Sequence, residues 1–508
     1  MSLKGKLFRM VGVCSALVVP LFAQETWLKQ FSADSSIMPV CACPATGGGY
    51  ILVGRHYPDT LTIGALVIRV DENGDLVSSR LLVNNLWPRQ ITQAADGGYF
   101  LTTDFGSSVV KLDSSLNVSW ARRVKGNDFD IGVLSWPGPD SGCLLLGNTW
   151  SFGYSNVLLS RLDKNGDLKW SKVFGQDGRD SVLALVQTDN GILLVGMCYL
   201  LSGSNNAMLI AEIDTSGNVL WSKRIGYEQG GNIARCVMRI PEGYFISGTT
   251  GSCDMANAIF LKIDTAGHIL RERAFGIYNE ENVSSVALAD DGGFILFGYM
   301  NSMSLGQNDV WIMKADTHGN LIWSKKIGTG FDDRGQNLFS VGDSAFVFAG
   351  SSVKEITPYE YKQVLWLGRF TAGGYNCMVS DCPQAVDACD FYVIPLDYAS
   401  YPVTPIVDTL NITAYDFPVV EDTICYESGV PEGHGGCQFS VVVPITINGG
   451  VVFRTGEPTT LHLYTVDGRL LSVLNLVAGD NRISLPPGVY LWRAEGRHGR
   501  MSGKAVVR

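Results

Sequence analysis

The sequence predicts an all-β protein, and three observations support this prediction: the composition, a repeated turn motif and a repeated glycine-led strand. The chain has 508 residues, of which 58 are glycine, and only 17% are charged. Soluble domains average about 25% charged residues and about 7% glycine. The composition therefore argues against a coiled coil, a helical bundle or a disordered chain, and favours strands joined by many turns.

The turn motif recurs about every 50 residues. It reads Asp-x-x-Gly-Asp/Asn, then an apolar residue and, in most copies, Trp two positions later. Successive copies lie 42, 50, 51, 50 and 52 residues apart, and such a period is typical of propellers and solenoids. The copies begin at Asp71, Asp113, Asp163, Asp214, Asp264 and Asp316, and the copy at Asp113 is weaker.

The second marker is a glycine-led apolar strand before each turn, and it occurs seven times. The sixth unit shows four short strands in order, HILRERAFG, ENVSSVALA, GGFILFG and DVWIMKAD. The first strand of the series, TWLKQF, begins at Thr26, and the last, VLWLGRF, ends at Phe370. Seven four-stranded units fit residues 24–376, so the sequence predicts a seven-bladed β-propeller, whose closed ring leaves only short protected edges.

The repeated residues have physical explanations. Asp at the start of each turn can accept backbone N–H bonds, and Gly three residues later permits the positive φ that closes a hairpin. A large flat indole can fill the gap between adjacent sheets, whereas Ser78 and Arg271 stand at that place in two units, where we expect looser junctions. The tryptophans at this position are Trp27, Trp120, Trp170, Trp221 and Trp323.

The units resemble those of bacterial secreted propellers built on strand-DxxGxxxW repeats, the quinoprotein-like class. The resemblance covers residues 26–376 and implies the propeller architecture. Such a fold hosts hydrolases, lyases, oxidoreductases and binding modules, so it does not indicate an activity. Quinoprotein enzymes add a cofactor pocket and metal ligands that we do not find in this sequence, and we expect no cofactor.

The N-terminus predicts an export signal over residues 1–23. Lys4, Lys6 and Arg9 precede an apolar stretch from Met10 to Phe22, and Ala23 offers a small residue for cleavage. That stretch is too short for a membrane-spanning helix of about 20 residues. No other apolar run approaches spanning length, so we expect a mature chain from Gln24 with no transmembrane segment.

Charge divides the rest of the chain into regions. Removing the three basic side chains of the signal takes the formal net charge from −10 to −13, which argues against nucleic acid or an anionic membrane as a partner. No Lys or Arg occurs from Phe370 to Phe453, while residues 377–440 hold ten acids. We expect residues 377–440 to form an acidic, cysteine-bearing linker or a small β region.

Residues 441–508 predict a small immunoglobulin-like β-sandwich. Its strands alternate, a hairpin lies at Asp467 and Gly468, a Pro-Pro-Gly turn ends at Gly488, Tyr490 follows, and Lys504 lies in the last strand. LHLYTVDGRLLSVLNL, NRISLPPGVYLWRAEG and the ending GKAVVR resemble type A sorting domains of type IX secretion cargo. The resemblance implies transport by the type IX machinery, through the periplasm, to the outer surface or the medium. A permanent accessory domain is the alternative.

Twelve cysteines are present, eleven of them after the signal. Five cluster in the acidic region, and export to an oxidising compartment favours disulfides among them. Zinc is the alternative, but no paired C-x₂-C spacing supports it. Cys143 and Cys198 are expected to be inert core thiols. The disulfide candidates are Cys377, Cys382, Cys389, Cys425 and Cys437.

Catalytic motifs are absent: the sequence has no G-x-S-x-G elbow, H-E-x-x-H helix or Walker A loop. Acids do recur in the loops after the tryptophan strands, which sevenfold geometry places on one face of the ring. They could bind Ca²⁺ or a cationic or polyhydroxylated ligand, or form a solvated rim. They are Asp128, Asp130, Asp177, Asp180, Glu228, Glu280, Glu281, Asp332 and Asp333.

The hypothesis that fits these observations is an exported propeller that binds a protein or a glycan through one face. The alternative is an extracellular enzyme, such as a polysaccharide-degrading hydrolase, with carboxylates near the propeller axis. A third interpretation is a structural component of a surface layer. A pair of titratable side chains in a deep axial pocket would favour the enzyme, and charge confined to the rim would favour binding.

Overall fold

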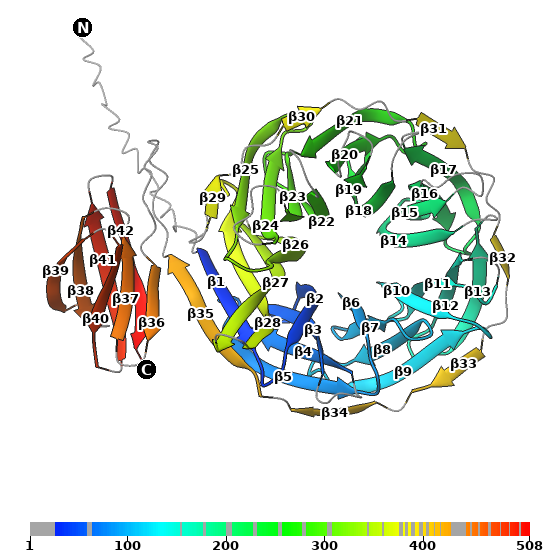
Figure 1. The fold of residues 1–508 in the computed structure, drawn as a ribbon. Helices are drawn as coiled ribbons and strands as arrows, with labels where there is room; N and C mark the ends of the chain where they lie inside the picture. Colours follow the sequence, from blue (N-terminus) through cyan, green and yellow to red (C-terminus); the bar gives the residue numbers. More distant parts are fainter. Residues whose placement is uncertain are drawn as a thin grey trace, which may run out of the picture.

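Seven β-sheets stand around a common axis in the computed structural model of the chain, and two smaller sheets follow them (Figure 1). This confirms the predicted fold class. The structure describes residues 26–57, 63–152, 155–175, 179–199, 206–226, 231–251, 257–276, 281–301, 307–342, 345–357, 360–374, 379–381, 385–387, 392–395, 400–402, 406–410, 412–416, 418–427, 443–447, 450–455, 458–465, 469–477, 479–486, 488–496 and 499–507.

Each blade consists of four antiparallel strands that run from the axis outward. Blades 1 to 3 are β2 (Ile37–Pro44), β3 (Tyr50–His56), β4 (Gly64–Val70) and β5 (Leu76–Val83); β6 (Pro88–Gln93), β7 (Tyr99–Thr103), β8 (Ser108–Leu112) and β9 (Val118–Lys125); and β10 (Asp130–Pro137), β11 (Cys143–Thr149), β12 (Asn156–Leu162) and β13 (Leu168–Phe174). Blades 4 and 5 are β14 (Asp180–Gln187), β15 (Gly191–Tyr199), β16 (Asn206–Asp214) and β17 (Val219–Gly226); and β18 (Asn232–Ile240), β19 (Gly243–Thr250), β20 (Asn257–Ile263) and β21 (Ile269–Gly276). Blade 6 is β22 (Glu281–Leu288), β23 (Phe294–Met300), β24 (Asp309–Ala315) and β25 (Leu321–Ile327), and blade 7 is β26 (Arg334–Val341), β27 (Ala345–Thr357), β28 (Glu360–Thr371) and β1 (Thr26–Ser32).

The two ends of the ring meet in blade 7. Its outer strand β1 comes from the start of the propeller and pairs with β28, so that Trp27 lies opposite Arg369 and Phe31 opposite Leu365. The predicted repeat unit is therefore offset by one strand, because HILRERAFG is the outer strand of blade 5 and not the first strand of blade 6. The strand before each glycine-led strand is the innermost one.

The apolar core lies between the blades. Seven clusters of buried side chains each join residues of two adjacent sheets, for example Leu193 of blade 4 with Ile246 of blade 5. Both faces of every sheet are thus covered by neighbours, as a closed ring requires.

The repeated aspartates close the hairpins between the third and fourth strands. Asp214 Oδ1 accepts the backbone N–H groups of Ser216, at 2.9 Å, and of Asn218, at 2.8 Å. Gly217 has φ +79°, a left-handed conformation that glycine adopts without strain. The same pattern of two backbone N–H groups on one carboxylate oxygen occurs at Asp71, Asp113, Asp163, Asp264 and Asp316.

Each outer-strand tryptophan packs on the turn of the next blade. A β-carbon placed on Gly217 would lie 2.9 Å from the ring of Trp170, so only glycine leaves room for the indole. Five junctions have this pair: Trp27 with Gly74, Trp120 with Gly166, Trp170 with Gly217, Trp221 with Gly267 and Trp323 with Gly374.

The two exceptional junctions are filled in other ways. The turn that faces Ser78 carries Leu116 in place of glycine, with φ +64° and only 1% of its surface exposed. Leu116 belongs to the cluster between blades 1 and 2, so the expectation of looser packing at Ser78 is wrong. At the other junction Arg271 Nε donates to the His318 carbonyl at 2.9 Å.

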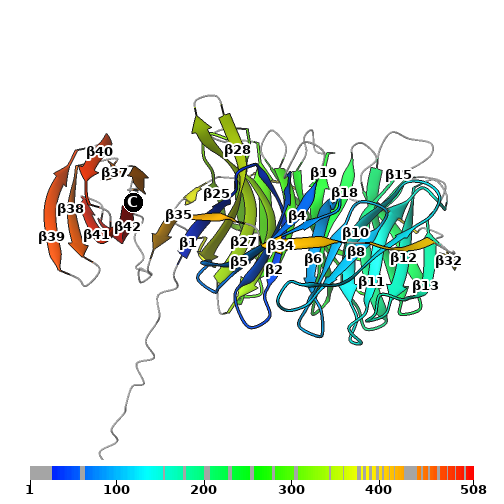
Figure 2. The same ribbon diagram turned by 90° about the horizontal axis from the view of Figure 1, so that it is seen from below.

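The acidic region forms a belt around the propeller, which we define as residues 379–427. Its seven short strands follow one another every six to eight residues and pair with the outer strands of blades 6, 5, 4, 3, 2, 1 and 7 in turn (Figure 1). Every blade therefore has five strands, and Figure 2 shows β34 and β32 lying along the outer wall. The belt strands are β29 (Val379–Asp381), β30 (Ala385–Asp387), β31 (Tyr392–Pro395), β32 (Ser400–Pro402), β33 (Ile406–Thr409), β34 (Thr413–Asp416) and β35 (Val420–Glu427).

Charge complementarity accompanies the pairing. Glu421 of β35 accepts from Lys29 Nζ at 2.8 Å and from the Leu76 N–H at 2.6 Å, so one carboxylate joins blades 7 and 1. Further ion pairs between belt and propeller are Lys354 with Asp422, Lys125 with Asp408 and Arg80 with Asp416. The lack of Lys and Arg in the acidic region thus matches the basic outer strands that it covers.

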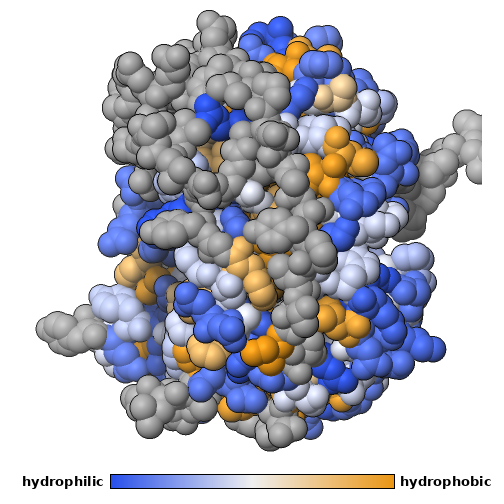
Figure 3. Space-filling model, turned by 90° about the vertical axis from the view of Figure 1, so that its right-hand side faces the viewer, coloured by the Kyte–Doolittle hydropathy of each residue, from blue (hydrophilic) through white to orange (hydrophobic). Residues whose placement is uncertain are grey.

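The wall of the propeller carries no large apolar surface on the side that Figure 3 shows. Among the side chains visible there, hydrophobic ones lie in small separate groups between hydrophilic ones. Two apolar belt residues, Leu410 and Ile412, instead pack against the cluster between blades 1 and 2.

The C-terminal strands form two sheets that face each other. Phe453, Leu461, Leu463 and Tyr490 are buried between them, and the Tyr490 hydroxyl donates to the Pro486 carbonyl at 2.8 Å. Gly488 begins β41, and in the backbone register Lys504 pairs with Leu491. The sheets consist of β36 (Val443–Ile447), β37 (Gly450–Thr455) and β40 (Gly479–Ser484), and of β38 (Thr459–Thr465), β39 (Leu470–Leu476), β41 (Gly488–Gly496) and β42 (Gly499–Val507).

Several sequence predictions fall outside the described residues. These are the signal over residues 1–23, Gly468, Cys377, Cys382, Cys389 and Cys437, while Cys425 is described only as backbone, opposite Leu28. The predicted disulfides therefore stay predictions. No helix in the described part of the chain is long and apolar enough to cross a membrane.

Candidate functional site

All seven inner strands carry a β-bulge at the same register. In β18, for example, Ala234 lies opposite Gly248 and Cys236 opposite Ser247, so Arg235 is the extra residue. Bulges re-aim side chains and often lie beside functional sites. The seven extra residues form what we call the bulge ring around the axis: Val40, Arg89, Val133, Leu183, Arg235, Ser284 and Gln336.

Glycine opposite the bulge makes this geometry possible in six of the blades. A β-carbon on Gly196 would lie 1.9 Å from the Ser181 carbonyl oxygen, and one on Gly298 would lie 1.8 Å from that of Asn282. The glycine that ends the repeated strand marker therefore positions the bulge. Blade 2 has Thr103 at this place, opposite Pro88.

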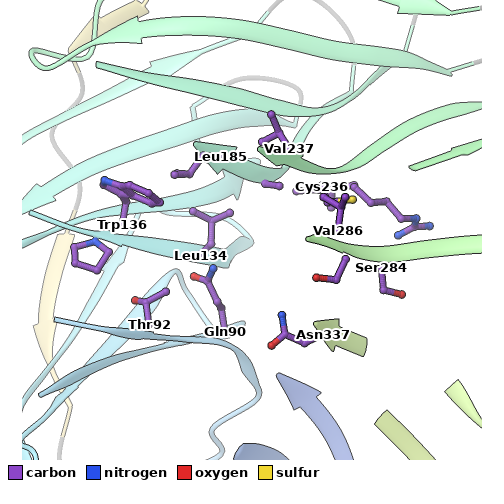
Figure 4. Close-up of a pocket in the computed structure, with 15 residues that line it drawn as sticks. Gln90, Thr92, Leu134, Trp136, Leu185, Cys236, Val237, Ser284, Val286 and Asn337 are labelled. Carbon is purple, nitrogen blue, oxygen red and sulfur yellow. The ribbon is translucent and has the colours of Figure 1, made fainter. Parts of the chain in front are cut away.

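A pocket of about 530 Å³ opens on the axis beside the bulge ring. Its walls come from six inner strands, β6, β10, β14, β18, β22 and β26, and Figure 4 shows the labelled side chains on different sides of one central space. One part of the wall is apolar, with Leu134, Trp136, Leu185 and Val237, and another part is polar. The polar side chains are Gln90, Thr92, Arg235, Ser284, Ser285 and Asn337.

The two amides of the pocket are held by neighbouring strands. Gln90 Oε1 accepts the Ser135 N–H at 3.0 Å, and Asn337 Oδ1 accepts the Ala42 N–H at 3.1 Å. With the oxygens engaged, each amide keeps its NH₂ group as a donor. The pocket therefore offers fixed hydrogen-bond donors on two sides.

Arg235 is the one residue with a permanent charge among the described lining residues. Its side chain is half-buried, and Nε is buried without a hydrogen-bond acceptor. The other arginine of the bulge ring, Arg89, forms an ion pair with Asp104. No Asp or Glu occurs in the described lining, so it contains no carboxylate pair of the kind that the enzyme alternative requires.

The acids predicted in the loops divide into two groups. Asp130, Asp180, Glu281 and Asp333 are buried at or next to the first residue of an inner strand, so a solvated rim does not describe them. Asp128 is exposed, and Asp332 pairs with Arg334 at 3.1 Å. Asp177, Glu228 and Glu280 lie outside the described residues.

Two of the buried acids hold the loop that leads into their strand. Asp130 Oδ2 accepts the Gly126 N–H at 2.6 Å, and Asp333 Oδ2 accepts the Thr329 N–H at 2.5 Å. Burial raises the pKa of Asp333 above its ordinary value, hydrogen bonds from Ser352 and Thr329 oppose this, and the charge of Asp309 adds to it. Among the described residues no group of three His, Cys, Asp or Glu side chains is arranged to hold a metal ion.

Sequence reasoning missed the residues that now define the site. Gln90, Trp136, Arg235 and Asn337 belong to no repeated motif, since each occurs in one blade only. A usable signal was the alignment of the strand before each glycine marker, where the residues of the bulge ring fall into one column. Asn232 was also missed: it takes the place of the buried acids in blade 5, and Thr250 Oγ1 donates to its side chain at 2.8 Å.

Five cysteines of the propeller are buried free thiols: Cys41, Cys43, Cys143, Cys198 and Cys236. Burial raises the pKa of Cys236, which borders the axial pocket, to about 12. Thiols of this kind are unreactive because the thiolate is the nucleophile.

No family model and no curated protein matches the chain. Solved structures that match include virginiamycin B lyase from Staphylococcus aureus, at 12% identity and TM-score 0.37, covering 67% of this chain and 98% of that one. PorZ of Porphyromonas gingivalis, a surface component of the type IX secretion system, matches at 9% identity and TM-score 0.25, covering 92% and 81%. A Bacteroides caccae protein of unknown function matches at 10% and 0.34, covering 59% and 93%. These values carry no information on ligand, activity or partners.

Proposed function

We propose that this chain is an exported propeller that binds a ligand in its axial pocket, with a glycan as the best-fitting class. The observation that carries the proposal is the composition of that pocket: fixed amide and hydroxyl groups on one part of its wall, and Trp136 with aliphatic side chains on another. A sugar presents hydroxyl groups at its edge and C–H groups on its faces, so it needs both kinds of wall.

Binding is favoured over hydrolysis by the same lining. Glycoside hydrolysis uses two carboxylic side chains on either side of the bond, and the described lining offers none. Peptide ligands of the outer loops remain the second class within the binding hypothesis. The long β27–β28 hairpin supplies an exposed Ile356 and Tyr361 for such a contact.

Delivery is the second part of the proposal. The predicted signal over residues 1–23 and the C-terminal sandwich are the two elements that type IX cargo requires, and the last residues resemble its type A sorting domains. In the native host, deletion of residues 441–508 should then retain the chain within the cell envelope. Unchanged release of that variant would support the accessory-domain alternative.

A glycan and protein binding screen with the purified chain tests the binding role, run with Ca²⁺ and with a chelator. Ala184 lines the pocket, so Ala184→Trp should fill it and abolish capture. Leu288 lies exposed at the end of β22, outside the pocket lining, and Leu288→Trp is the matched control. Capture that survives Ala184→Trp would contradict binding in the axial pocket, and calcium-dependent capture would support the predicted acidic-loop site.

A further inference from the structure

We infer that the axial pocket selects an anionic saccharide, one that carries a carboxylate or a sulfate group, and that Arg235 is the residue that binds the anion. This inference rests on the proposed binding function and specifies its ligand. It follows from three properties of the pocket: an uncompensated guanidinium, an excess of donors, and an apolar wall with an aromatic side chain.

The guanidinium of Arg235 has no carboxylate partner within the described part of the chain. It takes part in none of the ion pairs there, and its Nε is buried with no acceptor. A buried donor without an acceptor is costly, more so when it is charged. An arginine of this kind is a site for an oxyanion, since the planar fork matches a carboxylate or a sulfate with two parallel hydrogen bonds.

The bulge places this side chain on the axis. Regular pairing of β18 would turn alternate residues toward blades 4 and 6, whereas Arg235 is the unpaired extra residue and lines the pocket. Arg89 is its counterpart in blade 2 but is neutralised by Asp104. The ring therefore has one arginine engaged by the protein and one left for a ligand.

Donors outnumber acceptors around the same space. The oxygens of Gln90 and Asn337 are occupied by backbone N–H groups, which leaves their NH₂ groups to donate. Ser284 adds a hydroxyl group to the lining. An acceptor-rich anion satisfies these groups better than a neutral ligand with as many donors as acceptors.

The opposite wall explains why the anion should be part of a saccharide. Trp136 is half-buried and stands with Leu134 and Leu185 in the lining. An inorganic anion would leave this apolar surface exposed, whereas the face of a sugar ring would cover it. The net charge of the chain is negative, so selection of an anion must come from the local donors and not from the overall field.

Isothermal titration of the full chain tests the inference with a trigalacturonate, a sulfated disaccharide and a neutral galacto-oligosaccharide as probes. We expect at least one anionic probe to bind and the neutral probe to bind at least tenfold more weakly. Arg235→Gln should weaken the anionic probe at least tenfold, and Arg235→Lys should restore part of the loss. Arg89→Gln is the matched control and should leave binding unchanged.

Wild-type protein gives an independent readout if Arg235→Gln fails to fold. Raising the salt concentration from about 0.05 to about 0.5 M should weaken the anionic probe and leave any neutral probe unaffected, because salt screens the ion pair. Equal affinity for neutral and anionic probes, or no effect of Arg235→Gln, would overturn the inference. Neutral saccharides that bind and are blocked by Ala184→Trp would overturn it while the proposed function stands; no saccharide binding below about 1 mM, a weak affinity, would overturn both.

Discussion

The junction between blades 1 and 2 offers a test of how the blades pack. Five junctions pair a strand tryptophan with a turn glycine, and this one pairs Ser78 with Leu116. Since a β-carbon on Gly217 would lie 2.9 Å from the Trp170 ring, a tryptophan and a leucine cannot share one junction. We predict that Ser78→Trp and Leu116→Gly are each destabilising and that the double variant is close to the wild type.

The magnitudes follow from burial and backbone conformation. Removing the Leu116 side chain, which is 1% exposed, costs about 3 kcal/mol as a cavity, and relief of its left-handed φ returns about 1 kcal/mol, so Leu116→Gly should cost about 2 kcal/mol. Ser78→Trp alone should cost about 1–3 kcal/mol from overpacking. In the double variant the indole fills the space, which gives a favourable coupling of about 2–4 kcal/mol.

Urea denaturation of the four proteins measures this coupling in a double-mutant cycle. Val77 lies next to Ser78 with 58% of its surface exposed, so Val77→Trp is a matched control that should change stability by less than about 0.5 kcal/mol. Additive costs of Ser78→Trp and Leu116→Gly would refute the packing argument.

Three further predictions concern charged and ionisable groups. Lys29 bonds Asp75 at 2.5 Å and Glu421 at 2.8 Å, so Lys29→Met, which strands two carboxylates, should speed hydrogen exchange in β35 more than Glu421→Gln, after which Asp75 still pairs with Lys29; the reverse order would contradict the belt contact. The pKa of Asp333 is raised by burial, so its contribution to stability is greatest below its unfolded value of 3.8 and is lost as pH rises through the folded value; Asp333→Asn should be at least as stable as wild type at about pH 7 and show a smaller loss from about pH 4 upward in thermal denaturation, and a destabilised variant would argue against a strained carboxylate. Burial raises the pKa of Cys143 and Cys198 to about 12, so peptide mapping after iodoacetamide should find them modified only in denaturant, and rapid native labelling would contradict their burial.

The blades could be predicted from the sequence because their signals are local. Alternating strands and the Asp-x-x-Gly turn are read within ten residues, and the same carboxylate contacts recur in every copy, as at Asp214 and Asp316. The grouping of strands into sheets could not be read in the same way. Pairing between β25 and either neighbour is not local information, so the repeat unit was offset by one strand.

The belt was missed for a related reason. Its strands have three to eight residues and no periodicity of their own, because they pair with edges that the propeller already provides. The available signal was electrostatic: a region without Lys or Arg in a chain whose outer strands carry a basic residue two positions after the tryptophan site, as at Lys29 and Lys172. Complementary charge of this kind indicates contact rather than a free spacer.

The axial site was the least predictable part. Which side chain faces the axis depends on the bulge, and a bulge shifts the register by one residue without changing the apolar pattern. Arg235 therefore looked like any other polar residue of an alternating strand. The buried acids were found by position, but their burial was not, since loop residues are normally solvated.

Hydrogen exchange across residues 379–427 tests most directly whether each of the seven blades is completed by a fifth strand from the belt. Amides in β31, β33, β34 and β35 should exchange more slowly than an unstructured chain by orders of magnitude, and amides of the outer strands that they pair with should share this protection. Exchange of the entire region at the rate of a random coil would contradict the belt and leave the acidic region as a linker.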